Sequence, residues 1–140
     1  MDFTGKVVVI TGASSGIGEA LVYAFADRGA KVVMGARNSA KLAEIAAQLF
    51  TRGIESAFEA TDVTRGEDCK RLIDKALSAF GRIDILICNA GISMRALFDD
   101  VQLDVLRQLM DVNFWGTVYC AKYALPALQA AKGTRVGLSS

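Results

Sequence analysis

The chain of 140 residues is 52% hydrophobic and 22% charged, a balance that corresponds to one globular domain and excludes an intrinsically disordered protein. Its formal net charge of +1 argues against nucleic-acid and anionic-membrane partners. The absence of histidine excludes Ser-His and Cys-His nucleophile pairs and most zinc sites, so we expect no metal centre.

Short apolar runs alternate with helical apolar stripes along the whole chain. The runs are typical of strands buried on both faces, and the stripes are typical of helices that cover a sheet. The expected strands lie at residues 7–10, 32–34, 54–59, 83–88 and 134–138. The expected helices lie at residues 17–28, 39–52, 64–80 and 101–132.

Local signals refine the ends of these helices. Gly29 is placed to end the first helix in a left-handed cap, and the second helix stops at Gly53. Thr64 and Glu67 have the spacing of a capping box, which predicts the start of the third helix. Pro126 predicts a kink in the long fourth helical segment.

Short apolar strands that are joined by helices cannot pair as hairpins, because they need right-handed crossovers. They therefore predict an α/β fold with a doubly wound parallel sheet that is covered on both faces. Ligands bind such sheets at the carboxyl ends of the strands, so the residues that directly follow each strand are the candidate site.

The first strand runs directly into a turn that is rich in glycine and serine. Glycine permits a tight turn and a close approach to a phosphate, and the next helix offers free N–H groups at its N-terminus. The spacing is G-x-x-x-G-x-G with no lysine after it, which excludes a P-loop. The flanking strand and helix favour nucleotide binding over an ordinary Gly/Ser turn. The candidate residues are Gly12, Ser14, Ser15, Gly16, Ile17 and Gly18.

Arg37 follows the second strand, about twenty residues beyond Gly18. An acidic side chain at this distance would bind a ribose 2′-hydroxyl, whereas a guanidinium suits a 2′-phosphate. The sequence therefore predicts NADP rather than NAD as the cofactor. The alternative is that Arg37 is a solvated side chain near the start of a helix.

Polar or small residues also follow the third and fourth strands. Asp62 and Val63 could line an adenine site, although on spacing alone a turn-forming Asp is the better interpretation. Asn89 could tie adjacent strand ends together through its amide. Ala90 and Gly91 would leave room for a ligand against the backbone.

Three further polar residues have simple structural alternatives. Asn113 lies in an apolar helical stretch, where a hydrogen-bonded core asparagine is the simpler interpretation. Ser139 and Ser140 follow the fifth strand and would face the same cleft, unless they are only a polar chain end.

Taken together and in this order, the motifs resemble the short-chain dehydrogenase/reductase family over the whole chain. They are Thr11-Gly12-Ala13-Ser14-Ser15-Gly16-Ile17-Gly18, Asp62-Val63, Asn89-Ala90-Gly91, Asn113 and Ser139-Ser140. The resemblance implies a Rossmann-like fold, a nicotinamide cofactor and hydride transfer between that cofactor and a small-molecule alcohol or carbonyl substrate.

The same resemblance implies roles for the cofactor-binding candidates. The diphosphate and the adjoining ribose would lie on Gly12, Ser14, Ser15, Gly16, Ile17 and Gly18. The 2′-phosphate would lie on Arg37, the adenine on Asp62 and Val63, and the central part of the cofactor on Asn89, Ala90 and Gly91.

Two candidates take catalytic roles by resemblance. Asn113 would position a helix distortion and a proton-relay water, and Ser140 would hydrogen-bond the substrate oxygen. The family's general acid/base is a Tyr whose pKa, ordinarily about 10, is lowered by a Lys four positions later. None of Tyr23, Tyr119 and Tyr123 has a Lys at that spacing.

This departure leaves competing interpretations. The chain looks like the amino-terminal portion of a family member, so residues 1–140 would be an incomplete dinucleotide-binding domain, truncated after the fifth strand and inactive alone. The alternative is a non-catalytic dinucleotide-binding fragment. Arg37 argues against a nucleoside-binding transferase of similar fold. An interaction protein that keeps the fold without a ligand would not bind NADPH.

The helix over 101–132 carries four aromatic side chains, Phe114, Trp115, Tyr119 and Tyr123. In members of the resembled family the matching helix usually joins a subunit interface, so we expect a bare apolar patch and a homo-oligomer through this helix. Three cysteines without a CxxC pair, no signal-peptide pattern and no apolar run of about 18 residues predict a cytoplasmic protein with no membrane partner.

Overall fold

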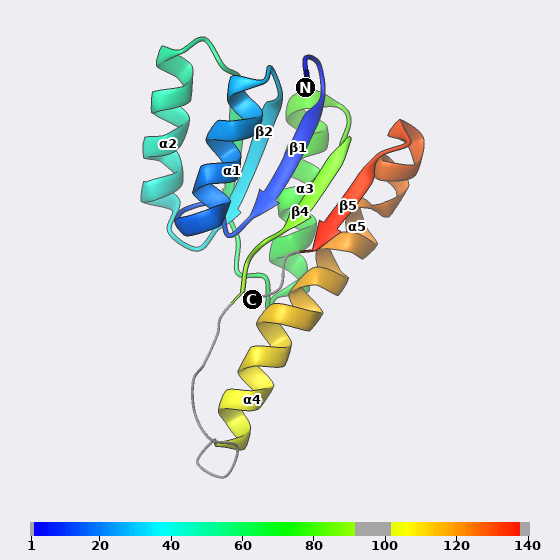
Figure 1. Ribbon diagram of the computed structural model, residues 1–140. Helices are drawn as coiled ribbons and strands as arrows, with labels where there is room; N and C mark the ends of the chain where they lie inside the picture. Colours follow the sequence, from blue (N-terminus) through cyan, green and yellow to red (C-terminus); the bar gives the residue numbers. More distant parts are fainter. Residues whose placement is uncertain (1, 92–101, 138–140) are drawn as a thin grey trace.

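The computed structural model describes residues 2–91 and 102–137, so the predicted Ser139 and Ser140 lie outside the described residues. Strands and helices alternate in the expected order (Figure 1). The strands are β1 (Val7–Thr11), β2 (Lys31–Ala36), β3 (Ser56–Ala60), β4 (Ile85–Cys88) and β5 (Thr134–Gly137). The helices are α1 (Gly16–Asp27), α2 (Ser39–Thr51), α3 (Gly66–Phe80), α4 (Leu103–Met110), the π-helical turn η2 (Asp111–Trp115) and α5 (Gly116–Ala131).

The strands of the described residues form one parallel sheet in the order β3-β2-β1-β4-β5. At its centre, Val9 of β1 pairs with Val33 of β2 on one side and with Leu86 of β4 on the other. The chain builds outward from β1 to β3 and then crosses to the opposite side of β1, so the strand order reverses between β1 and β4. This confirms the doubly wound parallel sheet, and it places the switch point, where such sheets bind ligands, between these two strands.

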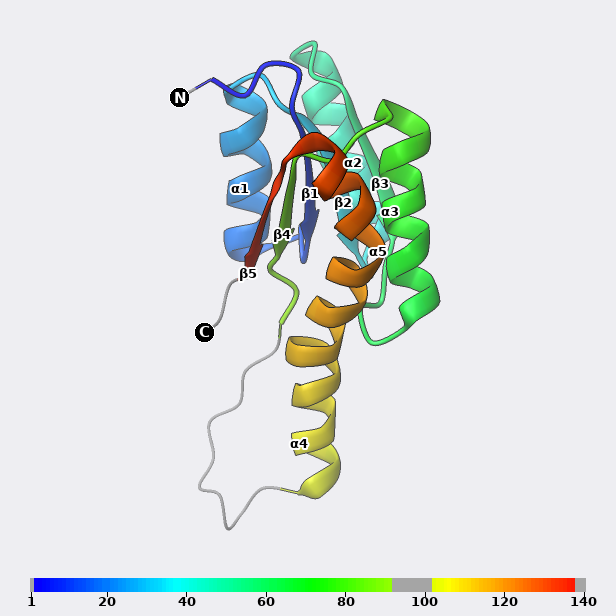
Figure 2. The ribbon, with the colours of Figure 1, turned by 90° about the vertical axis from the view of Figure 1, so that its right-hand side faces the viewer.

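Helices cover both faces of the sheet, with α1 on one side and α3 and α5 on the other (Figure 2). Val8 and Ile10 of β1 belong to the apolar core beneath α1 and α2, and Val7 and Val9 belong to the core beneath α3 and α5. All four side chains are buried. Because successive side chains of a strand point to opposite faces, a strand covered on both faces is apolar at every position.

The predicted capping box at the start of α3 is wrong. Arg65 takes the N-cap position without a side-chain cap hydrogen bond, and the helix begins at Gly66. The Thr64 hydroxyl donates instead to the Asp62 carboxylate at 2.7 Å, and the Thr64 amide donates to the same oxygen at 3.0 Å. The carboxylate of Asp62 therefore closes a turn ahead of α3. The Thr64 hydroxyl, which was expected to cap this helix, is bound to that carboxylate instead.

The long helical segment also contains a distortion that the apolar periodicity of the sequence did not predict. Helix α5 continues through Pro126 to Ala131, and the departure from the α-helical pattern lies upstream, in the π-helical turn Asp111–Trp115. A π-helical turn inserts one residue into the helix, which sequence periodicity does not reveal. Among the described residues, no helix has the length and hydropathy needed to cross a membrane.

A buried carboxylate fastens the amino ends of three strands. Asp84, with only 6% of its side chain exposed, accepts hydrogen bonds from the Val7 amide (2.9 Å) and from the Arg82 guanidinium (2.9 and 2.5 Å). Its backbone amide donates to Val7 and its carbonyl accepts from Thr134. Burial alone would raise the pKa of Asp84, but the bonds from Arg82 and Val7, with the charges of Arg82 and Lys6, outweigh it and hold the pKa below its ordinary value.

The Asp84→Asn variant should lose about 1–3 kcal/mol of unfolding free energy at pH 7, because the amide cannot accept all of these charged hydrogen bonds. Since the folded pKa lies below the unfolded value of about 3.9, the contribution of Asp84 is present above that value and disappears as the pH falls through the folded pKa. Urea unfolding from pH 7 to pH 3 should show the two proteins converging. Asp74→Asn, which removes an exposed partner of Lys70, should change stability by less than about 1 kcal/mol. A difference that stays constant with pH would contradict the assignment.

Candidate functional site

A cleft with a volume of about 630 Å³ lies at the carboxyl ends of the strands, where the sequence predicts the site. The loops that follow β1, β2, β3 and β4 contribute to its walls, together with the end of α4 and the start of η2. The predicted residues in its lining are Gly12, Ser14, Ser15, Ile17, Arg37, Asp62, Val63, Asn89, Ala90 and Gly91. Gly16 and Gly18 belong to the first turn of α1, and Asn113 belongs to η2.

Backbone contact between the β1 loop and α1 closes one end of the cleft. Gly12 adopts a φ of +64°, which favours glycine, and a Cβ built on Gly18 would stand 2.0 Å from the carbonyl oxygen of Gly12. The side-chain amide of Asn89 donates to that same carbonyl at 3.2 Å. Asn89 therefore ties the end of β4 to the loop after β1, as its position in the sequence indicated.

Thr11 completes this junction, although the sequence indicates no role for it beyond the motif. Its buried hydroxyl accepts hydrogen bonds from the amides of Asn89 and Ala90, both at 3.0 Å, and lies 3.5 Å from the carbonyl of Ile87. A hydroxyl can both donate and accept, so Thr11 satisfies backbone groups that β4 leaves unpaired where it ends. The signal that could have found it is a hydroxyl residue at the last position of a buried strand.

The N-terminus of α1 has the chemistry of an anion site. Ser15, the N-cap, has an extended backbone and makes no side-chain cap hydrogen bond, and the first helical bond runs from Glu19 to the Ser15 carbonyl. The amides of Gly16, Ile17 and Gly18 therefore have no acceptor within the helix. Their partial positive charge and the absence of side-chain bulk at the glycines fit a dinucleotide diphosphate.

The end of β2 brings a cation to the rim of the cleft. Arg37 is exposed, and Asn38 caps α2 by accepting the Lys41 amide at 3.1 Å. Asp62 follows the neighbouring strand β3. The hydrogen bond from the Thr64 hydroxyl is the largest influence on the pKa of Asp62 and lowers it. The Thr64 amide and the charges of Arg37 and Arg65 lower this pKa further, although partial burial opposes them. The turn-forming interpretation of Asp62 is correct, and its ionised carboxylate also lines the cleft.

The π-helical turn brings Asn113 to the edge of the cleft. A Cβ built on Gly91 would lie 3.0 Å from the side-chain oxygen of Asn113, so the absence of a side chain at Gly91 allows this approach. The Thr117 hydroxyl lies 3.2 Å from the Asn113 carbonyl and can donate to it. Asn113 is exposed rather than part of the core, and it stands in the middle of a distorted helical segment.

The lining also contains residues that the sequence did not indicate, namely Ala36, Asn38, Thr61, Thr64, Gln108, Asp111 and Val112. Asn38 could have been found, because asparagine directly before a helix is a common N-cap. The spacing of Gln108, Asp111 and Val112 places them on one helix face. Nothing in the local sequence shows that this face meets the loops at the ends of the strands.

A parallel sheet with a glycine-rich turn at its switch point defines a dinucleotide-binding α/β protein. Residues 6–140 match the family model described as short chain dehydrogenase. The chain belongs to this family of oxidoreductases, whose fold binds a nicotinamide dinucleotide and whose members act on small-molecule substrates.

Curated relatives and solved structures agree with this family. The chain is 44% identical to an 11-beta-hydroxysteroid dehydrogenase A of Sesamum indicum over 99% of its own length. It is 43% identical to an 11-beta-hydroxysteroid dehydrogenase-like 2 of Arabidopsis thaliana over 98% of its length. It spans 40% and 45% of these two proteins.

Two solved structures superpose closely on the chain. A short-chain type dehydrogenase/reductase of Mycobacterium marinum has a TM-score of 0.93 and 33% identity, over 99% of this chain and 57% of that one. An alcohol dehydrogenase of the archaeon Thermococcus sibiricus, complexed with 5-hydroxy-NADP, has a TM-score of 0.92 and 32% identity, over 94% of this chain and 57% of that one.

The contact between Gly18 and Gly12 should make the Gly18→Ala variant unstable, by about 3 kcal/mol, because the added methyl group meets backbone that must move. Gly16→Ala is the matched control: its methyl group meets nothing within 4 Å, and only the φ of +58° costs about 1 kcal/mol. Urea unfolding of the two variants measures the difference. If Gly18→Ala lost no more unfolding free energy than Gly16→Ala, the contact between Gly18 and the Gly12 carbonyl would be looser than described.

Proposed function

We propose that residues 1–140 form the dinucleotide-binding domain of an NADP(H)-dependent oxidoreductase that transfers a hydride between the cofactor and an alcohol or carbonyl substrate. The main support is the exposed guanidinium of Arg37 at the rim of the cleft, in the turn where an acidic residue would favour NAD. The sequence of this turn is Ala36-Arg37-Asn38, and it contains no acidic side chain.

The proposed cofactor contacts follow the walls of the cleft. The diphosphate would lie on the amides of the first turn of α1, with Ser14 and Ser15 beside it. Arg37 would hold the 2′-phosphate with a charge-assisted hydrogen bond. The adenine would lie near Asp62 and Val63, and the central part of the cofactor along Asn89, Ala90 and Gly91. The nicotinamide supplies or accepts the hydride when it is bound.

The proposed catalytic contribution of this chain is to position protons. Asn113 would orient a water molecule at the edge of the cleft through the distorted turn in which it lies. Ser140 would hydrogen-bond the substrate oxygen. Two relatives are named as hydroxysteroid dehydrogenases, which supports a substrate with a hydroxyl or carbonyl group. The NADP analogue in the Thermococcus sibiricus structure supports the choice of cofactor.

The second candidate function is binding of the dinucleotide without catalysis. It is favoured by one observation, that no Tyr among the 140 residues is followed four positions later by a Lys. The 140-residue chain alone is then inactive. Carbonyl reduction with NADPH by this chain alone separates the candidates, because any turnover excludes the binding-only function.

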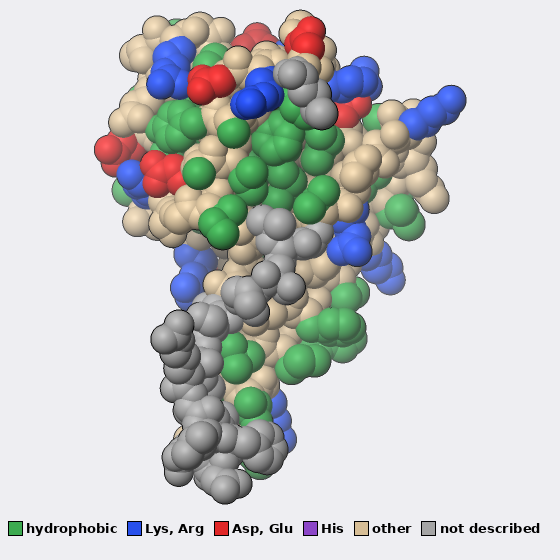
Figure 3. Space-filling view, in the orientation of Figure 1, with side chains coloured by type: hydrophobic (Ala, Val, Ile, Leu, Met, Phe, Trp, Pro, Cys, Tyr) green, Lys and Arg blue, Asp and Glu red, His purple; other side chains and the backbone are tan. Residues whose placement is uncertain are grey.

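We also propose that the chain works in the cytoplasm and associates with a second copy. Cys69, Cys88 and Cys120 are free and buried, which supports a reducing compartment. Helix α4 extends beyond the sheet (Figure 1), and hydrophobic side chains gather over α4 and α5 (Figure 3). Phe114 and Trp115 are about half exposed, at 50% and 44%.

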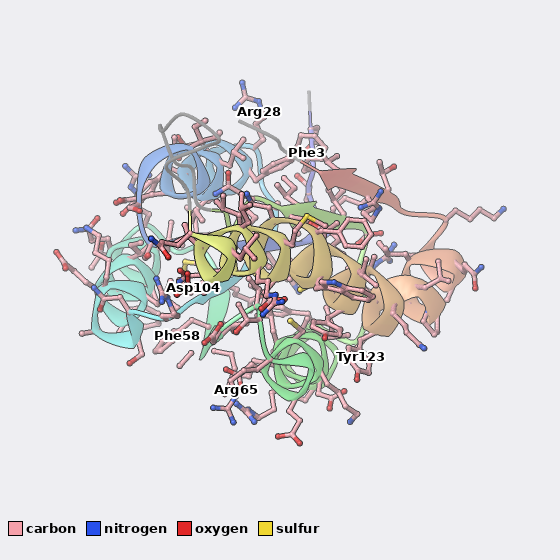
Figure 4. All side chains as sticks on the ribbon, turned by 90° about the horizontal axis from the view of Figure 1, so that it is seen from below. Phe3, Arg28, Phe58, Arg65, Asp104 and Tyr123 are labelled. Carbon is pink, nitrogen blue, oxygen red and sulfur yellow. The ribbon has the colours of Figure 1, made fainter. Side chains whose placement is uncertain are left out.

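The expected bare patch is smaller than the sequence suggested. Tyr119 packs against the core beneath α3, and both Tyr119 and Tyr123 lie close to Gly66 at the start of that helix. Seen from below, Tyr123 lies between α5 and α3 (Figure 4). Tyr123 nevertheless keeps 38% of its surface exposed, so the proposed association depends on Phe114, Trp115 and Tyr123 rather than on Tyr119.

If this face mediates association, Phe114→Glu should weaken the association at least about tenfold, because it buries a carboxylate in the interface. Light scattering at micromolar concentration should show a smaller mean mass. Phe50→Glu on α2 is the matched control, since Phe50 is 81% exposed and lies on another surface, and it should leave the mass unchanged. A wild-type chain that is monomeric at these concentrations would contradict the proposal.

Arg37→Ala should weaken NADPH binding much more than NADH binding, because it removes a charge-assisted contact worth about 1.5–3 kcal/mol. This loss corresponds to roughly 10- to 150-fold in Kd. Fluorescence titration of both cofactors measures it. Arg52→Ala, at the far end of α2, should change neither affinity. Equal losses for NADPH and NADH at Arg37 would overturn the NADP assignment.

A further inference from the structure

An ion pair joins the two helices whose N-termini border the cleft. The ammonium of Lys41, in the first turn of α2, lies 3.6 Å from the carboxylate of Glu19, in the first turn of α1. Both side chains are about one-third exposed, at 34% and 28%. The pair therefore spans the gap between the two helix starts without being sealed from water.

The direction of helical side chains places this pair beside the cleft. Side chains of a helix lean toward its N-terminus. The N-cap residues of the two helices, Ser15 and Asn38, both line the cleft. Glu19 and Lys41 thus lean toward the rim that carries Arg37, although neither of them lines the cleft itself.

The charge of Lys41 is not explained by the stability of its own helix. A cation in the first turn is repelled by the positive end of the helix dipole, and anions are the favoured charges at this position. Glu19 has the sign that suits the start of α1, but it also opposes an anion bound to the amides there. The charge of Lys41 therefore raises the affinity of the cleft for anions, and the charge of Glu19 lowers it.

We propose that Lys41 is a second cation of the site that selects the phosphate on the adenosine ribose, and that Glu19 limits its strength by competing for the ammonium. This inference rests on the proposed function. Without a cofactor the pair is neutral, and the ammonium remains close to its helix. A 2′-phosphate held by Arg37 offers Lys41 a second, more negative partner, so the ammonium divides its attraction between the phosphate and Glu19. NADH lacks that phosphate and leaves the pair undisturbed.

Two single substitutions in the full chain test the proposal, because they should act in opposite directions. Lys41→Gln should weaken NADPH binding about fivefold and change NADH binding less than twofold. Glu19→Gln should tighten NADPH binding about threefold, and more than it tightens NADH binding. Lys41→Arg, which keeps the positive charge, should keep the preference of the wild-type chain for NADPH over NADH. The measurement is the Kd of each cofactor by fluorescence titration, and 0.5 M KCl should shrink both effects.

The pair Lys70–Asp74 on α3 is the matched control. It is also an ion pair of lysine with a carboxylate, at 2.9 Å, and both of its side chains are exposed. Lys70→Gln and Asp74→Asn change the net charge of the chain by the same amounts as the test substitutions. They should leave the ratio of NADPH to NADH affinity unchanged, which separates the local effect from the effect of net charge.

The outcomes distinguish this inference from the proposed function. In one outcome, Arg37→Ala removes the preference for NADPH, but Lys41→Gln and Glu19→Gln shift the NADPH affinity in the same direction or leave it unchanged. The ion pair then only braces α1 against α2, and the inference is wrong. If the wild-type chain does not prefer NADPH and Arg37→Ala changes nothing, the proposed function itself fails. Opposite shifts that depend on NADPH support both.

Discussion

The arrangement of the site depends on one close approach of backbone to backbone. The carbonyl of Gly12 occupies the space where Gly18 would carry a side chain, and Asn89 donates a hydrogen bond to it. This contact sets the distance between the end of β1, the start of α1 and the end of β4. The amides at the start of α1 can bind an anion in the cleft only from that position. The same close backbone packing is therefore required for the fold and for anion binding.

The far wall of the cleft depends on a similar absence of side chains. A Cβ built on Gly116, at the start of α5, would lie 2.8 Å from a methyl group of Val63, and one built on Gly91 would lie 3.0 Å from Asn113. Glycine at these two places lets the helical segment that contains η2 approach the loops after β3 and β4. The cleft is therefore formed by packing between elements far apart in sequence.

The sequence predicted those features that depend on local pattern. Strands buried on both faces appear as unbroken apolar runs, so Val7 to Ile10 identified the central strand, and the glycine turn after it located the site. The capping box failed because Asp62, two residues before Thr64, accepts the hydroxyl that was expected to cap α3. The apolar periodicity did not reveal the π-helical turn Asp111–Trp115, because one inserted residue leaves no clear mark in it. The contact of Glu19 with Lys41 joins two helices, and no periodicity within either helix reveals it.

Asp84 fastens β1, β4 and β5 at the end of the sheet opposite the cleft. The anchor of the fold and its ligand site thus occupy separate ends of the same strands. Substitutions in the loops around the cleft leave this anchor intact, so a descendant of this chain can acquire a new ligand preference without first giving up its architecture. For protein engineering, the amino ends of the strands are the region to preserve, and the carboxyl ends are the region to diversify.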